Sequence, residues 1–229
     1  MFRRHKWLKR FLLGLGSLVV LFGLFVGGLF LWYQVRYSAT PWFTHNRITI
    51  SLPFAPEDEA TSIRALGEVE QVHPDGHGGM DFQWDQSVPI RSIADGRVSS
   101  IKRAEDMGDP VWYISIDSRE YRSTYKEMEN YVDGLATGSL VKQGQEIGRP
   151  HCTNKPDGVH THCQIHWEFS YASGVPTFTG HLDRLCPLTY FDAEASRRIT
   201  AIWDEVTARN ATIPGYPDLC NGPFKGFDQ

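Results

Sequence analysis

The stretch "HTHCQIHWEF", residues 160–169, alternates polar and apolar side chains as a β-strand with one buried face does. Ile165, Trp167 and Phe169 supply the apolar face of this strand. Because successive strand side chains point to opposite faces, the polar ones share the other face. They are His160, His162, Gln164, His166 and Glu168. A polar face of this kind meets solvent or lines a cleft, and for His166 we favour the cleft.

Further short strands surround this stretch, from about residue 67 to residue 190. The sequence "PIRSIADGRVSSIKRA", residues 89–104, predicts a hairpin that turns at Asp95-Gly96. "VWYISIDS", "EYRSTYKEM" and "SLVKQGQEIG" predict more strands. Because no helical pattern separates these segments, the predicted fold class is mainly β, a small antiparallel sheet or sandwich.

A helix is predicted after the β domain, in "DAEASRRITAIWDEVTARN", where Asp192 provides an N-cap. Its apolar side chains recur at helical spacing: Ala195, Ile199, Ile202, Trp203 and Val206. The expected organisation is a basic tail (1–10), an apolar segment (11–33), a stalk and lead-in (34–66), the β domain (67–190) and a C-terminal helix and tail (191–229).

The apolar segment from Phe11 to Tyr33 contains no charged residue and is long enough, as a helix, to span a bilayer core of roughly 30 Å. Five basic residues precede it, and the positive-inside rule therefore places residues 1–10 in the cytoplasm. The body of the protein is then periplasmic or otherwise extracytoplasmic. A cleaved signal peptide is the alternative, but its apolar region is usually about 7–15 residues long. We favour an uncleaved inner-membrane anchor.

Charge excludes one class of partner. The first 33 residues carry five of the 23 Lys and Arg residues and no Asp or Glu, so the remainder has 18 basic against 27 acidic side chains, a net charge of −9. Phosphate binding needs clustered cations, and we therefore expect no nucleic-acid partner.

The four cysteines lie in the part that is predicted to be outside the cytoplasm, where an even number indicates disulfides. Proximity favours Cys152–Cys163 and Cys186–Cys220, although four cysteines allow three pairings. A zinc site built from these cysteines is the alternative, but no CxxC spacing supports it.

A second polar motif, "HGGMDF" at residues 77–82, places His77 and Asp81 four apart around two glycines. Glycines let the backbone wrap closely around an ion. Taken alone, a Gly-rich turn that happens to carry two polar residues is the commoner explanation. Histidine and aspartate are ligands that Zn²⁺ accepts, and the polar face of residues 160–169 is the candidate for the other half of such a site.

Several motifs in one order resemble the lysostaphin/LytM-type zinc metallopeptidases, which cleave peptide cross-links in bacterial cell walls. They are "HGGMDF", "VPIRSIADGRV", "STYKEM", "LVKQGQEIG" and "QIHWEF", across about residues 67–190. The resemblance implies a small antiparallel β domain with a groove over a Zn²⁺ ion. It also implies that His77, Asp81 and His166 are the zinc ligands and that peptidoglycan peptides are the substrate.

The sequence departs from this family at the two histidines that resemble proton-transfer residues. The first histidine of the family's HxH motif is Gln164 here, and alignment on Tyr125 puts Glu127 where the tyrosine strand ends in a histidine. Glutamine does not titrate, whereas Glu127 can act as a base or close the site as a fourth metal ligand. His162 is another candidate substitute, although a solvent-exposed loop histidine is its simpler interpretation.

Two functions remain open at this point. One is a membrane-anchored zinc endopeptidase with an altered proton-transfer pair, and we lean towards this enzyme. The other is a non-catalytic LytM-like domain that binds metal or peptide and scaffolds or regulates other cell-wall or division enzymes. A lipoyl-like β-sandwich without metal is disfavoured, because it leaves the placement of the His and Asp residues to coincidence.

Overall fold

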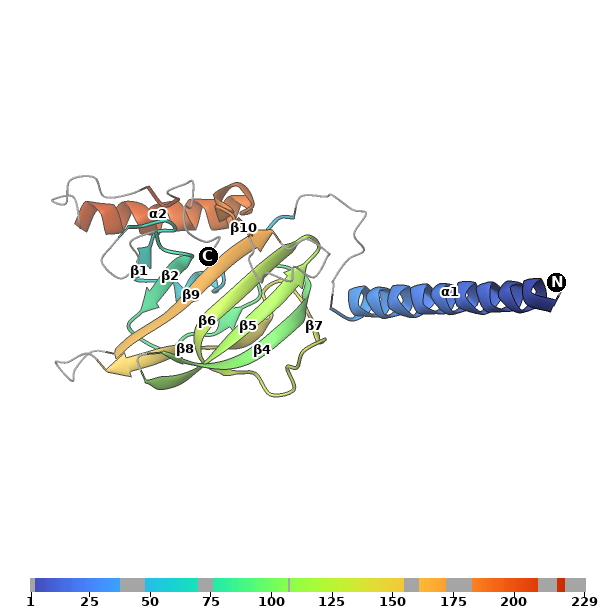
Figure 1. Cartoon of the computed structure of the whole chain (residues 1–229). Helices are drawn as coiled ribbons and strands as arrows, with labels where there is room; N and C mark the ends of the chain where they lie inside the picture. The colour runs from blue at the N-terminus through green and yellow to red at the C-terminus, as the bar shows by residue number, and fades with distance from the viewer. Residues whose placement is uncertain are drawn as a thin grey trace. The chain divides into compact units, whose positions relative to one another are not determined.

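Figure 1 shows the computed structural model of the chain, which describes residues 3–37, 48–69, 76–106, 108–154, 161–171, 183–209 and 218–220. The chain divides into two compact units, Met1–Arg36 and Tyr37–Gln229. Helix α1 (Arg3–Tyr37) makes up the first unit. Its span Gly14–Trp32 has a mean hydropathy of 2.3 and is long and apolar enough to cross a membrane. The predicted N-terminal apolar helix is therefore confirmed as a helix.

The second unit is built on one antiparallel sheet, in the order β1-β2-β9-β8-β6-β5-β4-β7, with β3 paired to β8 and β10 paired to β9. The strands are β1 (Ser62–Arg64), β2 (Met80–Trp84), β3 (Ile90–Arg91), β4 (Gly96–Asp106), β5 (Asp109–Ser118), β6 (Tyr121–Tyr131), β7 (Leu140–Val141), β8 (Glu146–Asn154), β9 (Thr161–Tyr171) and β10 (Asp183–Arg184). Two short 3₁₀ helices, η1 (Pro56–Asp58) and η2 (Pro187–Thr189), and helix α2 (Ala193–Arg209) complete the described elements. The predicted fold class, mainly antiparallel β with a C-terminal helix, is confirmed.

Strand β9 organises this sheet. One edge of β9 pairs with β2, while the other edge pairs first with β8, along residues 161–164, and then with β6, along residues 166–171. On its apolar face, Ile165 and Trp167 are buried in the core, and Trp167 packs 6.0 Å from the ring of Phe82 on β2. The apolar side chains of the alternating sequence therefore face the core, and the polar ones, such as His166, face the candidate site.

The prediction of a hairpin in residues 89–104 is wrong. Strand β3 pairs with β8, whereas β4 pairs with β5 and β7. Gly96 is needed for close packing, because a Cβ atom there would lie 2.5 Å from Ser118 Oγ and 2.9 Å from the Asp117 carbonyl oxygen. The hairpin of this region instead joins β4 to β5, where Asp106 pairs with Asp109 and Gly108 adopts a φ of 93°.

Helix α2 covers one end of this sheet, as Figure 1 shows, and makes contacts with β1. Four of the five apolar side chains predicted for its inner face are buried, and Trp203 is partly buried. The backbone N–H of Ala195 donates to Asp192 Oδ1 at 2.7 Å, which confirms Asp192 as the N-cap. Residues 48–55 of the lead-in pack into the same core through Ile50, Leu52 and Phe54.

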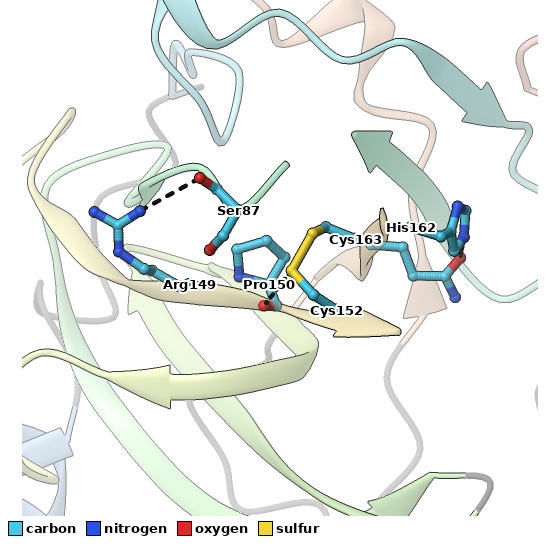
Figure 2. Close-up of a disulfide and its surroundings, with 7 residues drawn as sticks. Ser87, Arg149, Pro150, Cys152, His162 and Cys163 are labelled. Carbon is cyan, nitrogen blue, oxygen red and sulfur yellow. Dashed lines mark hydrogen bonds between the residues drawn. A yellow bond between two sulfur atoms is a disulfide. The ribbon is translucent and has the colours of Figure 1, made fainter. Parts of the chain in front are cut away.

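Both disulfides favoured by proximity are present, Cys152–Cys163 and Cys186–Cys220, so no cysteine is left for a metal. Cys152 and Cys163 lie directly opposite each other on β8 and β9, with their Cα atoms 4.0 Å apart. Figure 2 shows this bridge joining the two strands beside His162. It holds β8 against β9 next to the polar face of β9.

The two disulfides should contribute unequally to stability. Their sequence separations are 11 and 34 residues. In the chain-entropy model, losses of about 2.8 kcal/mol for Cys152→Ser/Cys163→Ser and about 3.8 kcal/mol for Cys186→Ser/Cys220→Ser follow from these loop lengths. Urea unfolding of the two double variants, as full chains in detergent, measures the difference. Equal losses of unfolding free energy in the two variants, or a larger loss for Cys152→Ser/Cys163→Ser, would contradict this prediction.

Candidate metal centre

Strands β2 and β9 bring the predicted ligands together. In their antiparallel register Asp81 is opposite His166, so the two side chains lie on the same face of the sheet. His77 comes from the segment just before β2. Its Nε2 lies 3.1 Å from Asp81 Oδ1 and 3.0 Å from His166 Nδ1, and His166 Nδ1 lies 2.9 Å from the same Asp81 oxygen. Three donor atoms from two separate segments therefore converge on one point.

Each histidine ring also has a hydrogen-bond partner on its far side. His77 Nδ1 lies 3.0 Å from the Ala65 carbonyl oxygen, which can only accept, so this nitrogen carries the proton. His166 Nε2 lies 3.3 Å from Glu168 Oε1 and its Nδ1 lies 2.9 Å from Asp81 Oδ1, so each nitrogen of this ring faces a carboxylate oxygen. With the proton of His166 on Nε2, the lone pairs of His77 Nε2 and His166 Nδ1 would face each other at 3.0 Å beside a carboxylate. This arrangement calls for a cation between them.

The donor set fits zinc. Tetrahedral ligands about 2.0–2.1 Å from the ion lie about 3.3 Å apart. The three separations of 2.9–3.1 Å need to widen by only a few tenths of an ångström. His77 and Asp81 are buried and the His166 side chain is 12% exposed, so the point between them is largely shielded from solvent. Imidazole and carboxylate groups in this number are typical of a zinc site that keeps a position for water or substrate.

Burial and charge pull the pKa values of these groups in opposite directions. Burial would lower the pKa of His166, but its hydrogen bonds with Asp81 and Glu168 outweigh that effect and raise the pKa to about 9. Burial would raise the pKa of Asp81, but the two histidines hold it well below its usual range. Without a metal, a proton on His166 therefore provides the required cation.

Close contact with β9 explains why residue 79, in the motif "HGGMDF", is a glycine. A Cβ atom at this position would lie 2.5 Å from the Trp167 carbonyl oxygen and 2.8 Å from His166 Nε2. The backbone before β2 thus passes so close to β9 that only glycine fits. The segment brings His77 next to His166 because of that close approach.

Charged side chains around Glu168 hold His166 in place, and no role was predicted for them. Glu168 is buried and accepts from Lys126 Nζ at 2.5 Å, while Arg184 Nη2 lies 2.8 Å from its other oxygen. Burial would raise the pKa of Glu168, but His166 and these two cations lower it to about 2. The two-residue spacing from His166 could have indicated Glu168. Arg184 had no such signal, because its place depends on the pairing of β10 with β9.

Glu127 lies at a β-bulge. Trp112 pairs with Met128 and Ile114 with Tyr125, so Lys126 and Glu127 both oppose the single residue between Trp112 and Ile114. The φ of Glu127 is 59°, in the left-handed region. In the same place β6 separates from β9, after the pair Lys126–His166, and β8 takes over as the partner of β9. The bulge thus puts Lys126 and Glu127 together on the face that carries the site.

The carboxylate of Glu127 contacts Gln164, which donates from Nε2 to Glu127 Oε2 at 2.7 Å. Burial, followed by the negative charge of Asp81, raises the pKa of Glu127. Among the described residues, the donor atoms that lie within 4.8 Å of one another belong to His77, Asp81 and His166. Glu127 is therefore a neighbour of the three-residue group and not a member of it.

His162 belongs to strand β9, not to a loop, and its Nε2 lies 3.2 Å from Gln164 Oε1. Gln164 therefore links His162 to the site. His160, which the alternation assigned to the same face, lies outside the described residues.

Comparisons with known proteins find relatives of the part of the chain that carries this site. Residues 75–175 match the model of Peptidase family M23. The peptidoglycan DD-endopeptidase ShyB of Vibrio cholerae is 31% identical over 91 residues, which cover 39% of this chain. The chain spans only 20% of that relative's length.

Two solved structures also match this chain, each at less than 25% sequence identity. Csd3 of Helicobacter pylori is 21% identical, with a TM-score of 0.46 over 72% of this chain and 42% of that one. A zinc-containing peptidase from Vibrio cholerae is 22% identical, with a TM-score of 0.42 over 57% of this chain and 39% of the other. Residues 75–175 thus match peptidase family M23, in agreement with the ordered motifs that resemble the lysostaphin/LytM type.

Proposed function

We propose that this protein is a membrane-anchored, zinc-dependent endopeptidase that cleaves peptide cross-links of peptidoglycan. The observation that carries the proposal is the convergence of three ligand atoms, from His77, Asp81 and His166, within 2.9–3.1 Å of one another. In a domain of a peptidase family, this is the donor set that zinc catalysis requires. One sequence relative, ShyB of Vibrio cholerae, is a peptidoglycan DD-endopeptidase.

Zinc, when bound, would polarise the scissile carbonyl and make the attacking water more acidic. A group of the protein must then take a proton from that water and return it to the leaving nitrogen. We assign this role to Glu127, whose pKa is raised by burial and by Asp81, so that it accepts a proton more readily than an exposed glutamate. Gln164 does not titrate, so it can neither take the proton from the water nor give one to the leaving nitrogen.

The proposed location follows from helix α1 and the disulfides. The span Gly14–Trp32 would anchor the chain in the inner membrane, with residues 1–10 in the cytoplasm. Two disulfides suit the oxidising periplasm, where peptidoglycan is the neighbouring polymer. The peptidase domain would then extend over about residues 67–190, after the lead-in, with the C-terminal helix and tail behind it.

A non-catalytic LytM-like domain is the second candidate, and one observation favours it. Both histidines of the proton-transfer pair are replaced, and their replacements, Gln164 and Glu127, are hydrogen-bonded to each other. A protein of this kind would keep the metal for stability or peptide binding and would act on other cell-wall enzymes.

Zinc content is the first test. The full chain, purified in detergent, should hold one zinc ion, and His166→Ala should lose it because two remaining ligands bind zinc weakly. His162→Ala, a histidine on the same face of β9, should keep it. Metal analysis after dialysis against buffer with trace zinc provides the measurement. A folded wild-type chain without zinc would overturn the assigned metal centre.

Cleavage is the second test. The zinc-loaded wild type should release peptide fragments from cross-linked peptidoglycan, and Glu127→Gln should lower kcat by about 10²–10⁴-fold, the usual contribution of general acid–base catalysis. Zinc content should stay unchanged in that variant. Glu129→Gln, an exposed glutamate on the same strand, is the matched control. A folded, zinc-loaded wild type that releases no peptide would favour the non-catalytic function.

The outer layer gives a third test. Glu168→Gln should weaken zinc binding by about 10–100-fold, because the carboxylate that orients His166 is lost and two cations remain without their counter-charge. Competition with a chelator of known affinity measures the change. Unchanged affinity in a folded variant would show that Glu168 does not support the ligand.

A further inference from the structure

The two residues that replace the family's histidines form a pair. Gln164 comes from β9 and Glu127 from the bulge of β6, and Gln164 Nε2 donates to Glu127 Oε2 at 2.7 Å. This is a short hydrogen bond to a carboxylate that is mostly removed from solvent. Gln164 therefore does more than fill the space of a missing histidine.

The amide of Gln164 is oriented from its other end. Its Oε1 lies 3.2 Å from His162 Nε2, and Gln83 Nε2 donates to it at 3.5 Å. Two donors on the oxygen leave the nitrogen directed at Glu127. The chain His162–Gln164–Glu127 thus gives each polar atom of the amide a partner of the correct kind.

The backbone on both sides of this pair is constrained as well. Gln164 follows Cys163, whose disulfide to Cys152 fixes β8 against β9, and it pairs in register with His151. Glu127 is held at a φ of 59°, where a residue other than glycine is retained only if its surroundings demand it. A long, flexible glutamate side chain on such a backbone still needs a partner to select one rotamer.

We propose that Gln164 is a positioning residue, which holds one carboxylate oxygen of Glu127 and leaves the other to exchange the proton of the reaction. The inference rests on the proposed peptidase function. Glutamine suits this task because its amide donates a hydrogen bond at every pH and never competes for the proton. A histidine at this position would titrate together with Glu127. Glu127 and Gln164 therefore replace the two histidines as a matched pair.

The test is a double-mutant cycle on the full chain in detergent, loaded with zinc and assayed on cross-linked peptidoglycan. Gln164→Leu should lower kcat by about 10–100-fold, with KM within twofold of wild type, because misplacement of a reacting group costs turnover rather than binding. In the Glu127→Gln background the same substitution should have no further effect on kcat. Gln86→Leu, at an exposed glutamine beyond β2, is the control for an added apolar side chain.

Each outcome decides the inference. Wild-type kcat in Gln164→Leu, or losses that multiply in the double variant, would overturn the positioning role while the peptidase function stands. A zinc-loaded wild type without activity would overturn the peptidase function, and the inference with it. Thermal unfolding checks each variant, and Gln164→Met, which keeps the length of the side chain, replaces the leucine variant if that one fails to fold.

Discussion

The antiparallel register between β2 and β9 is the constraint on which the rest of this domain depends. It sets Asp81 beside His166 on one face and Phe82 beside Ile165 on the other. Because side chains alternate with a period of two, a slip of one residue would send the aromatic core outward and the ligands inward. Burial of the apolar face therefore selects the same register that assembles the candidate metal centre. No further interaction is needed to align these two strands for the site, because packing of the core already aligns them.

How far the sequence predicts this structure depends on the range of the interactions. The alternation in residues 160–169 predicted β9 and the orientation of His166, and "HGGMDF" added two ligands once both were seen in one ordered set of motifs. Partners distant along the chain were beyond local patterns. The 89–104 hairpin failed for this reason, because β3 pairs with β8. The bulge at Glu127 had no sequence signal, since it arises where β9 changes its partner.

Electrostatic balance extends the site beyond its three ligands. The buried carboxylates of Asp81 and Glu168 are set against Arg64, Lys126 and Arg184, which come from β1, β6 and β10. Removing charge from water is costly unless each ion keeps a partner. The short edge strands β1 and β10 therefore matter to the centre although they supply no ligand. Sequence patterns detect ligands more easily than such compensating charges.

The Cys152–Cys163 bridge has a consequence for the connection between β8 and β9. Cys152 lies near the end of β8 and Cys163 near the start of β9, so the disulfide joins the two strands across that connection. The two strands therefore stay covalently linked even if the peptide chain between them is cut. A proteolytic nick there would leave β9 still joined to β8, with Gln164 one residue from the link. The same connection could accept an inserted segment without releasing the strand that carries His166. The domain thus has a second covalent connection beside the strand that carries His166 and Gln164.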